Sequence, residues 1–172
     1  DLVASLYGRS QITEILYETT RDVFIPLTAG GGIRNIDDVH QLLRSGADKV
    51  AINTAAVRNP ELISEVAKKY GNQCMVLSIE AKKRSSSSWE IYTECGREST
   101  GIEVSEWAKK AELLGAGEIL LTSIDCEGTR KGFDLDLMKC ITSEVSIPVI
   151  ASGGFGNISH IKPVLNTGVD AI

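Results

Sequence analysis

The sequence has few aromatic residues, no long apolar run and no marked excess of charge. Phe, Trp and Tyr make up 5% of the 172 residues, and 18 Lys+Arg stand against 23 Asp+Glu. The charges are scattered, and without a basic stripe we expect no nucleic-acid partner. No apolar run reaches the ~18 residues that a membrane span requires, and residue 1 does not open a signal peptide, so we expect no membrane association.

Paired spacings that hold metals or disulfides are also missing. The four cysteines form no C-x-x-C pair, which favours a reducing cytoplasm and argues against a disulfide framework. His40 and His160 fall in helical periods without carboxylate or cysteine partners at ligand spacing. We therefore expect neither a metal nor another cofactor.

The most informative feature that is present is an internal repeat. Residues 25–33, IPLTAGGGI, return 122 residues later as residues 147–155, IPVIASGGF. The match continues without a gap to Val50 and Ile172, with 10 identities in 26 paired positions. A period this long exceeds a solenoid repeat and fits half of a (β/α)₈ barrel, which typically takes ~250 residues. The repeat predicts two equivalent sites on one barrel.

Short β-branched runs alternate with amphipathic segments, which predicts successive βαβ units and a parallel sheet. Strands are expected at 25–29, 49–53, 74–80, 117–124 and 147–151, with strand ends at 1–4 and 169–172. Helices are expected near 10–22, 36–44, 60–69, 103–114, 134–143 and 157–167. Residues 81–101 break the alternation and predict a flexible, partly hairpin excursion at the carboxyl end of a strand, where barrels place functional loops.

The repeat also bears on the size of the barrel. It implies a parent of about 244 residues, so we interpret residues 1–172 as a single, partial (β/α)₈ domain. The first strand and helix and the last strand–helix unit would be missing. We expect the chain alone to be inactive and prone to association, because unpaired parallel edges are exposed.

Two glycine-rich turns follow predicted strands, at residues 30–32 and 152–154. Glycine lets backbone amides approach an anion closely, and the following helix adds its positive end. Asn53-Thr54 ends the next strand, where it would complete a phosphate cup with Gly31 and Gly32. Each glycine run could instead be only a tight turn. Two runs in symmetric register favour phosphate, and hence a bis-phosphorylated substrate stretched across the barrel mouth.

Acidic residues fall at three strand ends: Asp1, Glu80, and the pair Asp125 and Glu127. Carboxylates at that rim suit general acid–base catalysis, particularly where burial raises their pKa. The alternative is that they bond loop amides or lysines such as Lys82. Catalysis is favoured for Glu80, and the two interpretations are balanced for Asp1 and Asp125.

The strand beginnings carry charge as well. Lys49 and Glu118 each precede an apolar run and so belong to the opposite, amino-terminal end of the barrel, where charge usually serves stability. Taken alone, the pair predicts a salt bridge that plugs the barrel floor.

Over its whole length, the chain resembles the cyclase-subunit family of imidazole glycerol phosphate synthase. The stretches that carry the resemblance are residues 26–34 (PLTAGGGIR), 46–50 (GADKV), 52–56 (INTAA), 115–125 (GAGEILLTSID) and 150–154 (IASGG). The sister isomerase of histidine synthesis shares the half-barrel repeat but lacks the Asn-Thr-Ala-Ala and Leu-Thr-Ser-Ile-Asp stretches in this form.

The resemblance implies an ammonia-dependent reaction. A glutaminase partner would dock on the barrel floor and release ammonia, which passes along the barrel axis. At the other end, ammonia would meet a bis-phosphorylated formimino-aminoimidazole carboxamide ribonucleotide. Cyclisation and cleavage would yield imidazole glycerol phosphate and aminoimidazole carboxamide ribonucleotide.

The resemblance also implies roles for individual residues. The acid–base pair of the family is an Asp on the first strand, absent here, and an Asp on the fifth strand, which maps onto Glu80. One phosphate site maps onto Gly32, Asn53 and Thr54, and the other onto Gly128, Ser152, Gly153 and Gly154. Lys49 and Glu118 map onto the charged floor gate for ammonia, and Asp48 and Gln73 onto the partner interface.

Two positions depart from the family pattern, since Glu80 and Glu127 stand where the family usually has Asp. Each change keeps the charge but moves the carboxylate by roughly 1.5 Å, a scale at which catalysis can fall steeply. A compensated active site or a paralogue with a modified acceptor would explain both. The alternatives to the cyclase are thus a paralogous barrel subunit that delivers ammonia to another acceptor, such as a surface-polysaccharide sugar, and a non-catalytic glutaminase-binding scaffold.

Overall fold

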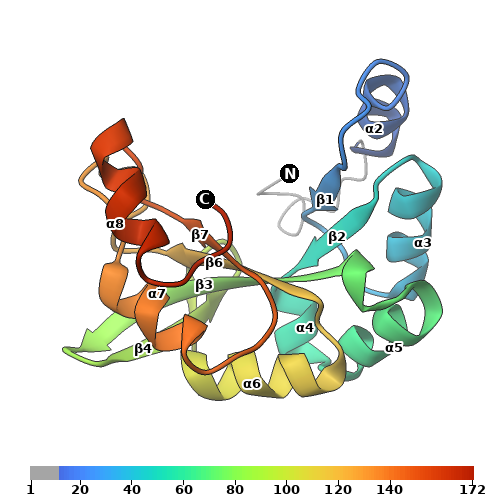
Figure 1. Cartoon of the computed structure of the whole chain (residues 1–172). Coiled ribbons are helices and arrows are strands. Elements are labelled where there is room, and N and C mark those ends of the chain that lie inside the picture. Colours follow the sequence, from blue (N-terminus) through green and yellow to red (C-terminus); the bar gives the residue numbers. More distant parts are fainter. Residues whose placement is uncertain (1–11) are drawn as a thin grey trace.

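A computed structural model of the chain describes residues 12–172, and within them five parallel strands form a curled sheet (Figure 1). The sheet order of these strands is β1–β2–β3–β6–β7. Their bounds are β1 Thr28–Gly30, β2 Lys49–Ile52, β3 Met75–Ser85, β6 Glu118–Ser123 and β7 Val149–Ser152. The prediction of an incomplete (β/α)₈ barrel is confirmed: helices alternate with the strands and lie outside the curl.

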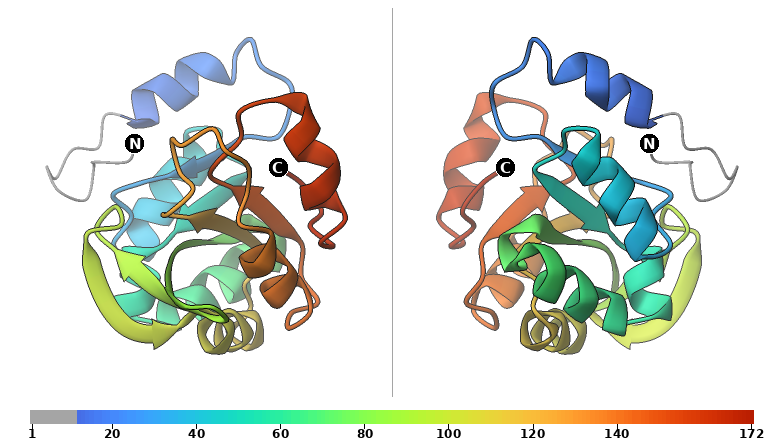
Figure 2. Two further views of the ribbon diagram at one scale, coloured as in Figure 1. Left: turned by 90° about the vertical axis from the view of Figure 1, so that its left-hand side faces the viewer. Right: turned by 90° about the vertical axis from the view of Figure 1, so that its right-hand side faces the viewer.

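The helices cover the convex face of this sheet, and the concave face stays open (Figures 1 and 2). The bounds of the α-helices are α2 Ile12–Thr19, α3 Ile36–Arg44, α4 Thr54–Arg58, α5 Glu61–Tyr70, α6 Val104–Leu114, α7 Leu135–Thr142 and α8 Ile161–Leu165. Two 3₁₀ turns, η1 Asn72–Cys74 and η2 Ile158–His160, complete the connections.

Side chains of the strands divide between the two faces of the sheet with the expected period of two. On β2, Val50 and Ile52 are buried under the helices, while Lys49 and Ala51 stay partly exposed on the concave face. The same division holds on β6, where Ile119 and Leu121 are fully buried. The hydrophobic core therefore lies between sheet and helices, and the concave face is left for polar groups.

The internal repeat is realised as the same hydrogen bonds in both halves. Asp48 Oδ2 accepts a bond from the backbone N–H of Leu27 at 2.8 Å, and Asp170 Oδ2 accepts one from Val149 at 2.9 Å. In return, the Asp48 amide donates to the Leu27 carbonyl and the Asp170 amide to the Val149 carbonyl. Each aspartate thus ties the start of one strand to the start of the next.

The helix ends repeat too. Asn35 caps α3 by accepting the amides of Asp37 and Asp38, and Asn157 caps η2 by accepting the amide of Ser159. An asparagine at this position satisfies amides that a helix start would otherwise leave without a partner.

Residues 81–101 form an ordered excursion from the carboxyl end of β3. β3 continues past the parallel sheet and pairs antiparallel with β4 (Ser88–Thr93), which pairs with β5 (Glu98–Glu103). The hairpin prediction is confirmed, and two antiparallel ladders, each with one register shift, hold the excursion.

The excursion contains a buried carboxylate, Glu90, which is 3% exposed. Glu90 accepts hydrogen bonds from the Ser99 hydroxyl, from the Gly101 amide at 2.6 Å and from Arg84 Nε at 2.7 Å. The Ser99 hydrogen bond, followed by those from Gly101 and Arg84, outweighs burial and lowers the pKa of Glu90. This network fixes β5 against the β3–β4 ribbon.

Some element boundaries differ from the sequence predictions. β1 begins at Thr28 rather than at residue 25, and helix α4 was not predicted at all. The expected strand at 169–172 is reduced to a single parallel bridge between Ile150 and Ala171. The expected strand end at 1–4, with Asp1, lies outside the described residues.

We expect Glu90→Gln to destabilise the protein by about 1–3 kcal/mol at pH 7, because buried donors lose a charged acceptor. Since the pKa of Glu90 is lowered in the folded state, its contribution is present above the ordinary glutamate pKa and is lost as pH falls through the folded value. Urea unfolding measured between pH 7 and pH 3 should show the gap between the variant and the parent closing. Glu98→Gln, at an exposed ion pair on the same hairpin, is the control and should stay within ~0.5 kcal/mol at every pH; a constant gap for Glu90→Gln would contradict the account.

Candidate active site

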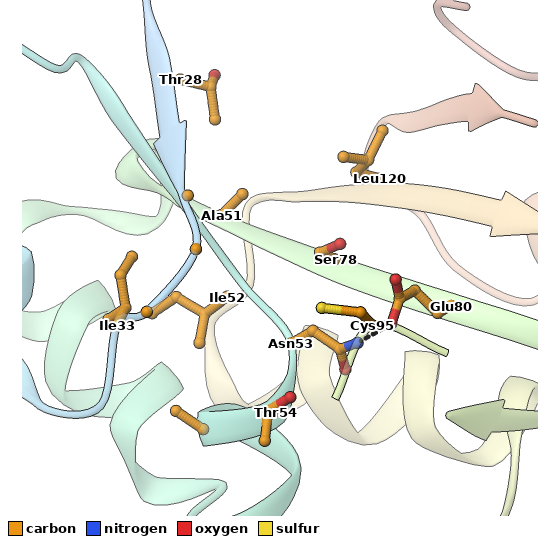
Figure 3. Close-up of a pocket in the computed structure, with 14 residues that line it drawn as sticks. Thr28, Ile33, Ala51, Ile52, Asn53, Thr54, Ser78, Glu80, Cys95 and Leu120 are labelled. Carbon is orange, nitrogen blue, oxygen red and sulfur yellow. Dashed lines mark hydrogen bonds between the residues drawn. The ribbon is translucent and has the colours of Figure 1, made fainter. Parts of the chain in front are cut away.

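A pocket of about 370 Å³ opens on the concave face, at the carboxyl ends of β1, β2 and β3 (Figure 3). On β1 and on β3 the residues that line it are two positions apart, as the pleat requires. The residues that line the pocket are Thr28, Gly30, Gly31, Gly32, Ile33, Ala51, Ile52, Asn53, Thr54, Ala55, Ser78, Glu80, Cys95 and Leu120. The pocket brings together Gly31, Gly32, Asn53, Thr54 and Glu80, all of them predicted site residues from three separate strand ends.

Glu80 projects from β3 toward Asn53 and the β4–β5 turn (Figure 3). Its Oε2 accepts a hydrogen bond from Asn53 Nδ2 at 2.9 Å and one from the Gly96 amide at 2.9 Å. Burial raises the pKa of Glu80, and the bonds from Gly96 and Asn53 oppose that rise. The result is a half-buried carboxyl group with a raised pKa in a pocket, which is the environment of a general acid–base group.

Asn53 and Thr54 hold the β4–β5 turn against the end of β2. Asn53 Nδ2 also donates to the Tyr92 carbonyl at 3.1 Å, and Thr54 Oγ1 accepts the Glu94 amide at 3.1 Å. Thr54 is also the first residue of α4, a five-residue helix. These predicted phosphate-cup residues therefore have structural partners, and the Thr54 hydroxyl proton remains available to an oxygen ligand.

The first glycine turn has the backbone shape that its sequence predicts. Gly31 and Gly32 have φ of 97° and 73°, in the left-handed region that favours glycine. Both line the pocket beside Thr54. The first of the two predicted phosphate sites therefore borders the pocket.

The second glycine turn is packed against another loop. A Cβ on Gly154 would lie 2.0 Å from the Gly132 carbonyl oxygen, and the Gly132 amide donates to the Gly154 carbonyl at 2.8 Å. A Cβ on Gly153 would lie 3.4 Å from Glu127 Oε2. Close packing against Gly132 is sufficient to explain glycine at position 154. This glycine therefore has a structural role that does not depend on phosphate binding.

The loop after β6 brings two predicted carboxylates and Gly128 to the same rim. Glu127 and Gly128 are exposed beside the Ser152–Gly153–Gly154 turn, outside the pocket that holds Glu80. Asp125 Oδ2 accepts the Lys83 amide at 2.8 Å, which ties the loop to the excursion. That contact is the loop-amide alternative that the sequence left open for Asp125.

Lys49 and Glu118 form an ion pair at the other end of the sheet. Lys49 Nζ lies 2.8 Å from Glu118 Oε2, and the two side chains are 32% and 18% exposed. The pair bridges the first residues of β2 and β6 across the intervening β3. Both side chains share the concave face with Ala51 and Leu120, so the ion pair and the pocket lie on one surface at opposite strand ends.

The two predicted partner-interface residues are exposed near this floor. The Asp48 carboxylate caps the Leu27 amide, as described above, and Gln73 Nε2 donates to the Tyr70 carbonyl at 3.0 Å. The equivalent bond made by Asp170 shows that the fold accounts for Asp48 without a partner. Its interface role stays a prediction.

The sequence reasoning missed three contributors to the pocket. Ser78 faces it from β3, Cys95 lines it from the β4–β5 turn, and Gly96 supplies an amide to Glu80. Ser78 was accessible to period-two counting back from Glu80. Cys95 and Gly96 could not be found in this way, because no local sequence pattern shows that the hairpin folds back over the end of β3, the strand that it leaves.

Comparison with known proteins identifies the family to which the chain belongs. Residues 1–172 match a family described as histidine biosynthesis protein. The chain belongs to this family. It is 63% identical over 162 residues to the imidazole glycerol phosphate synthase subunit HisF of Legionella pneumophila, a match that covers 94% of this chain and 76% of the relative.

More distant members of the family are similar along the whole chain. The subunits of the same name from Mycobacteroides abscessus and Dictyoglomus thermophilum are 48% and 47% identical. Each match covers 100% of this chain and 69% and 68% of the relative. The resemblance drawn from the sequence motifs is confirmed.

Residues 12–172 contain neither a membrane-spanning helix nor a cluster of metal-ligating side chains. None of the helices there combines the length and apolar character needed to cross a membrane. Nor do three or more His, Cys, Asp or Glu side chains gather anywhere in that range as a metal site would require.

We expect Glu80→Gln to raise the melting temperature at pH 7. The pKa of Glu80 is raised in the folded state, so ionisation costs stability as pH rises through the range between its unfolded and folded pKa values. Glutamine keeps the acceptor oxygen without the charge. Thermal melts at pH 7 and pH 4 test this: the gain should be present at pH 7 and vanish at pH 4, whereas a variant that is less stable at pH 7 would contradict the burial argument.

Proposed function

We propose that this chain is part of an enzyme that carries out the cyclase reaction of imidazole glycerol phosphate synthase. Ammonia and a bis-phosphorylated formimino-aminoimidazole carboxamide ribonucleotide are converted into imidazole glycerol phosphate and aminoimidazole carboxamide ribonucleotide. The observation that carries the proposal is the half-buried Glu80 carboxyl group in a pocket with Asn53, Thr54 and the Gly31-Gly32 turn. The family match and the names of the relatives support the proposed reaction.

In this proposal the pocket binds one phosphate and presents the reacting group. The amides of Gly31 and Gly32 and the Thr54 hydroxyl would bind the phosphate, and Asn53 would orient Glu80. Glu80 would move the proton that ring closure requires, because burial brings its pKa toward the working pH. Asp125 and Glu127 are the next candidates for this chemistry.

The second phosphate would bind on the same rim. Parallel strands bring the turn at residues 152–154 and Gly128 to the edge that also carries the first glycine turn. Loop packing explains glycine at 154, and Gly153, with φ of 94°, repeats the left-handed backbone of its counterpart Gly31 at 97°.

The partner in this proposal is a glutaminase subunit that docks on the floor near Asp48 and Gln73. The names of the relatives identify each as one subunit of a synthase. Ammonia would enter beside the Lys49–Glu118 pair, and the enzyme would work in the cytoplasm without a cofactor. The whole concave face, from floor to rim, would form the path.

One observation favours a second candidate, a paralogous subunit that delivers ammonia to another acceptor. Glu80 and Glu127 both stand where the family usually has Asp, and both lie on the rim where the acceptor binds. A longer carboxylate at each position narrows the space for the acceptor. The two candidates share the floor, so only acceptor specificity separates them.

The test of the proposed chemistry is Glu80→Gln in the complete protein, assayed with ammonium chloride and the ribonucleotide. We expect kcat to fall by about 10²–10⁴-fold, the usual contribution of a general acid–base group, with substrate binding retained. Glu80→Asp is the matched control and should remain active. Near-normal turnover by the glutamine variant would transfer the chemistry to Asp125 or Glu127.

The gate proposal predicts a difference between two nitrogen sources. Lys49→Ala should lower glutamine-driven turnover about ten-fold, equivalent to ~1.4 kcal/mol in the barrier, because the variant breaks the ion pair at the ammonia entrance. Turnover with added ammonium chloride should change much less. Parallel assays with both sources check this, and an equal loss in both would identify the ion pair as structural.

A further inference from the structure

We propose that the β4–β5 turn, residues 94–97, is a positioning segment that holds the Glu80 carboxylate through the backbone amide of Gly96. This inference rests on the proposed role of Glu80 as the acid–base group. It adds to that role a structure outside the parallel sheet, with Gly96 as the positioning residue.

Glu80 Oε2 receives two hydrogen bonds of 2.9 Å, one from Asn53 on the neighbouring strand and one from Gly96 on the turn. Donors from two separate elements fix a side chain more firmly than one donor does, since each bond restricts a different rotation. If the turn were displaced, this oxygen would lose the hydrogen bond from Gly96 and keep the one from Asn53.

The backbone of the turn is unusual in the way that functional segments are. Glu94, Cys95 and Gly96 have φ of 50°, 60° and 71°, three consecutive residues in the left-handed region. Two of them are not glycine, and such a conformation persists only where surrounding contacts enforce it. The strained conformation of the turn therefore requires contacts with neighbouring elements that hold it in place.

Three contacts hold the turn and the strand before it against the end of β2 and helix α4. Arg58 lies 3.0 Å from Glu94 Oε1, a carboxylate whose side chain is 12% exposed. Thr54 Oγ1 accepts the Glu94 amide, and Asn53 donates to the Tyr92 carbonyl. The turn is therefore clamped to the phosphate-cup side of the pocket, with its Gly96 amide directed at Glu80.

The pocket contains few other groups that could determine the protonation of Glu80. Among the described lining residues, Cys95 on the turn itself is the other titratable side chain, and the remaining polar neighbours are Asn53, Thr54, Ser78 and Thr28. Tyr92 faces Glu80 across the β3–β4 ladder and Thr122 across the β3–β6 ladder. A change in the turn should therefore register on Glu80 rather than on a competing charge.

The test compares Gly96→Ala with Gly101→Ala in the complete protein. Both glycines lie in the excursion with φ of 71° and 76°, so alanine costs similar backbone strain at each. A Cβ at 96 would also press on the Ile124 side chain at 3.3 Å, whereas at 101 it would meet nothing within 4 Å. Displacement of the Gly96 amide should lower kcat with ammonium chloride by about 10–100-fold, the cost of misplacing a reacting group by about 1 Å, with KM nearly unchanged. Gly101→Ala should stay within about two-fold.

A second pair of variants tests the clamp without altering the backbone. Glu94→Gln removes the negative charge of the less exposed carboxylate that pairs with Arg58. Glu98→Gln removes the charge of the exposed carboxylate, which lies 3.6 Å from Arg58. We expect kcat to fall in the first and not in the second. Equal effects of the two, at equal melting temperatures, would overturn the clamp.

The pH profile separates positioning from a merely structural role. Loss of a donor to the carboxylate raises its pKa, so the limb of the kcat profile that reports Glu80 should move to higher pH in Gly96→Ala. A shift to lower pH would mean that the turn only shields Glu80 from water, and an unchanged limb with normal kcat would overturn the inference. The parallel Glu80→Gln assay keeps the two proposals apart: if that variant is active, the role of Glu80 fails, and if it is inactive while Gly96→Ala is normal, the turn alone fails.

Discussion

The parallel pairing of β3 with β2 on one side and β6 on the other determines where every candidate functional group lies. The register sets Val50 beside Met75 and Val76 beside Glu118, so the three strands begin nearly level. Charges that precede the strands then meet at one end, as Lys49 and Glu118 do, and polar groups that end the strands meet at the other. A slip of one residue would turn Glu80 toward the buried helix side. The site thus depends on strand register before it depends on any side-chain contact.

Several residues that are identical in the two halves of the chain have the same structural role in both. Asp48 and Asp170 bind strand-start amides, Asn35 and Asn157 cap helical turns, and these contacts keep the same geometry in both halves. A repeated residue near a site is therefore weak evidence of a role in chemistry. Among the described residues, the pocket that holds Glu80 borders the first glycine turn, whereas the second turn packs against the loop at Gly132.

The architecture and most of the rim could be predicted because they depend on local, periodic signals. Alternating strand and helix patterns predicted the parallel sheet, and the residues that end strands predicted Asn53, Thr54 and Glu80 on one rim. What could not be predicted is non-periodic: helix α4 is a five-residue segment without a helical period of its own, and the Gly96–Glu80 contact joins a turn to the strand it left. The packing of Gly154 on Gly132 was equally inaccessible, since glycine for close approach and glycine for anion binding look alike in sequence.

A glutamate at position 80, where the family resemblance implies aspartate, can be reconciled with the proposed catalytic role through the same contacts. A glutamate has one more rotatable bond than aspartate, and its free carboxylate would sample several positions within the pocket. Here that freedom is removed at the far end of the side chain, where Asn53 and Gly96 bind one oxygen from two directions. The second oxygen receives no bond from either and remains the one to meet a substrate proton. Burial raises the proton affinity of the group while the two donors limit that rise, so the excursion compensates for the extra methylene in position and in pKa at once.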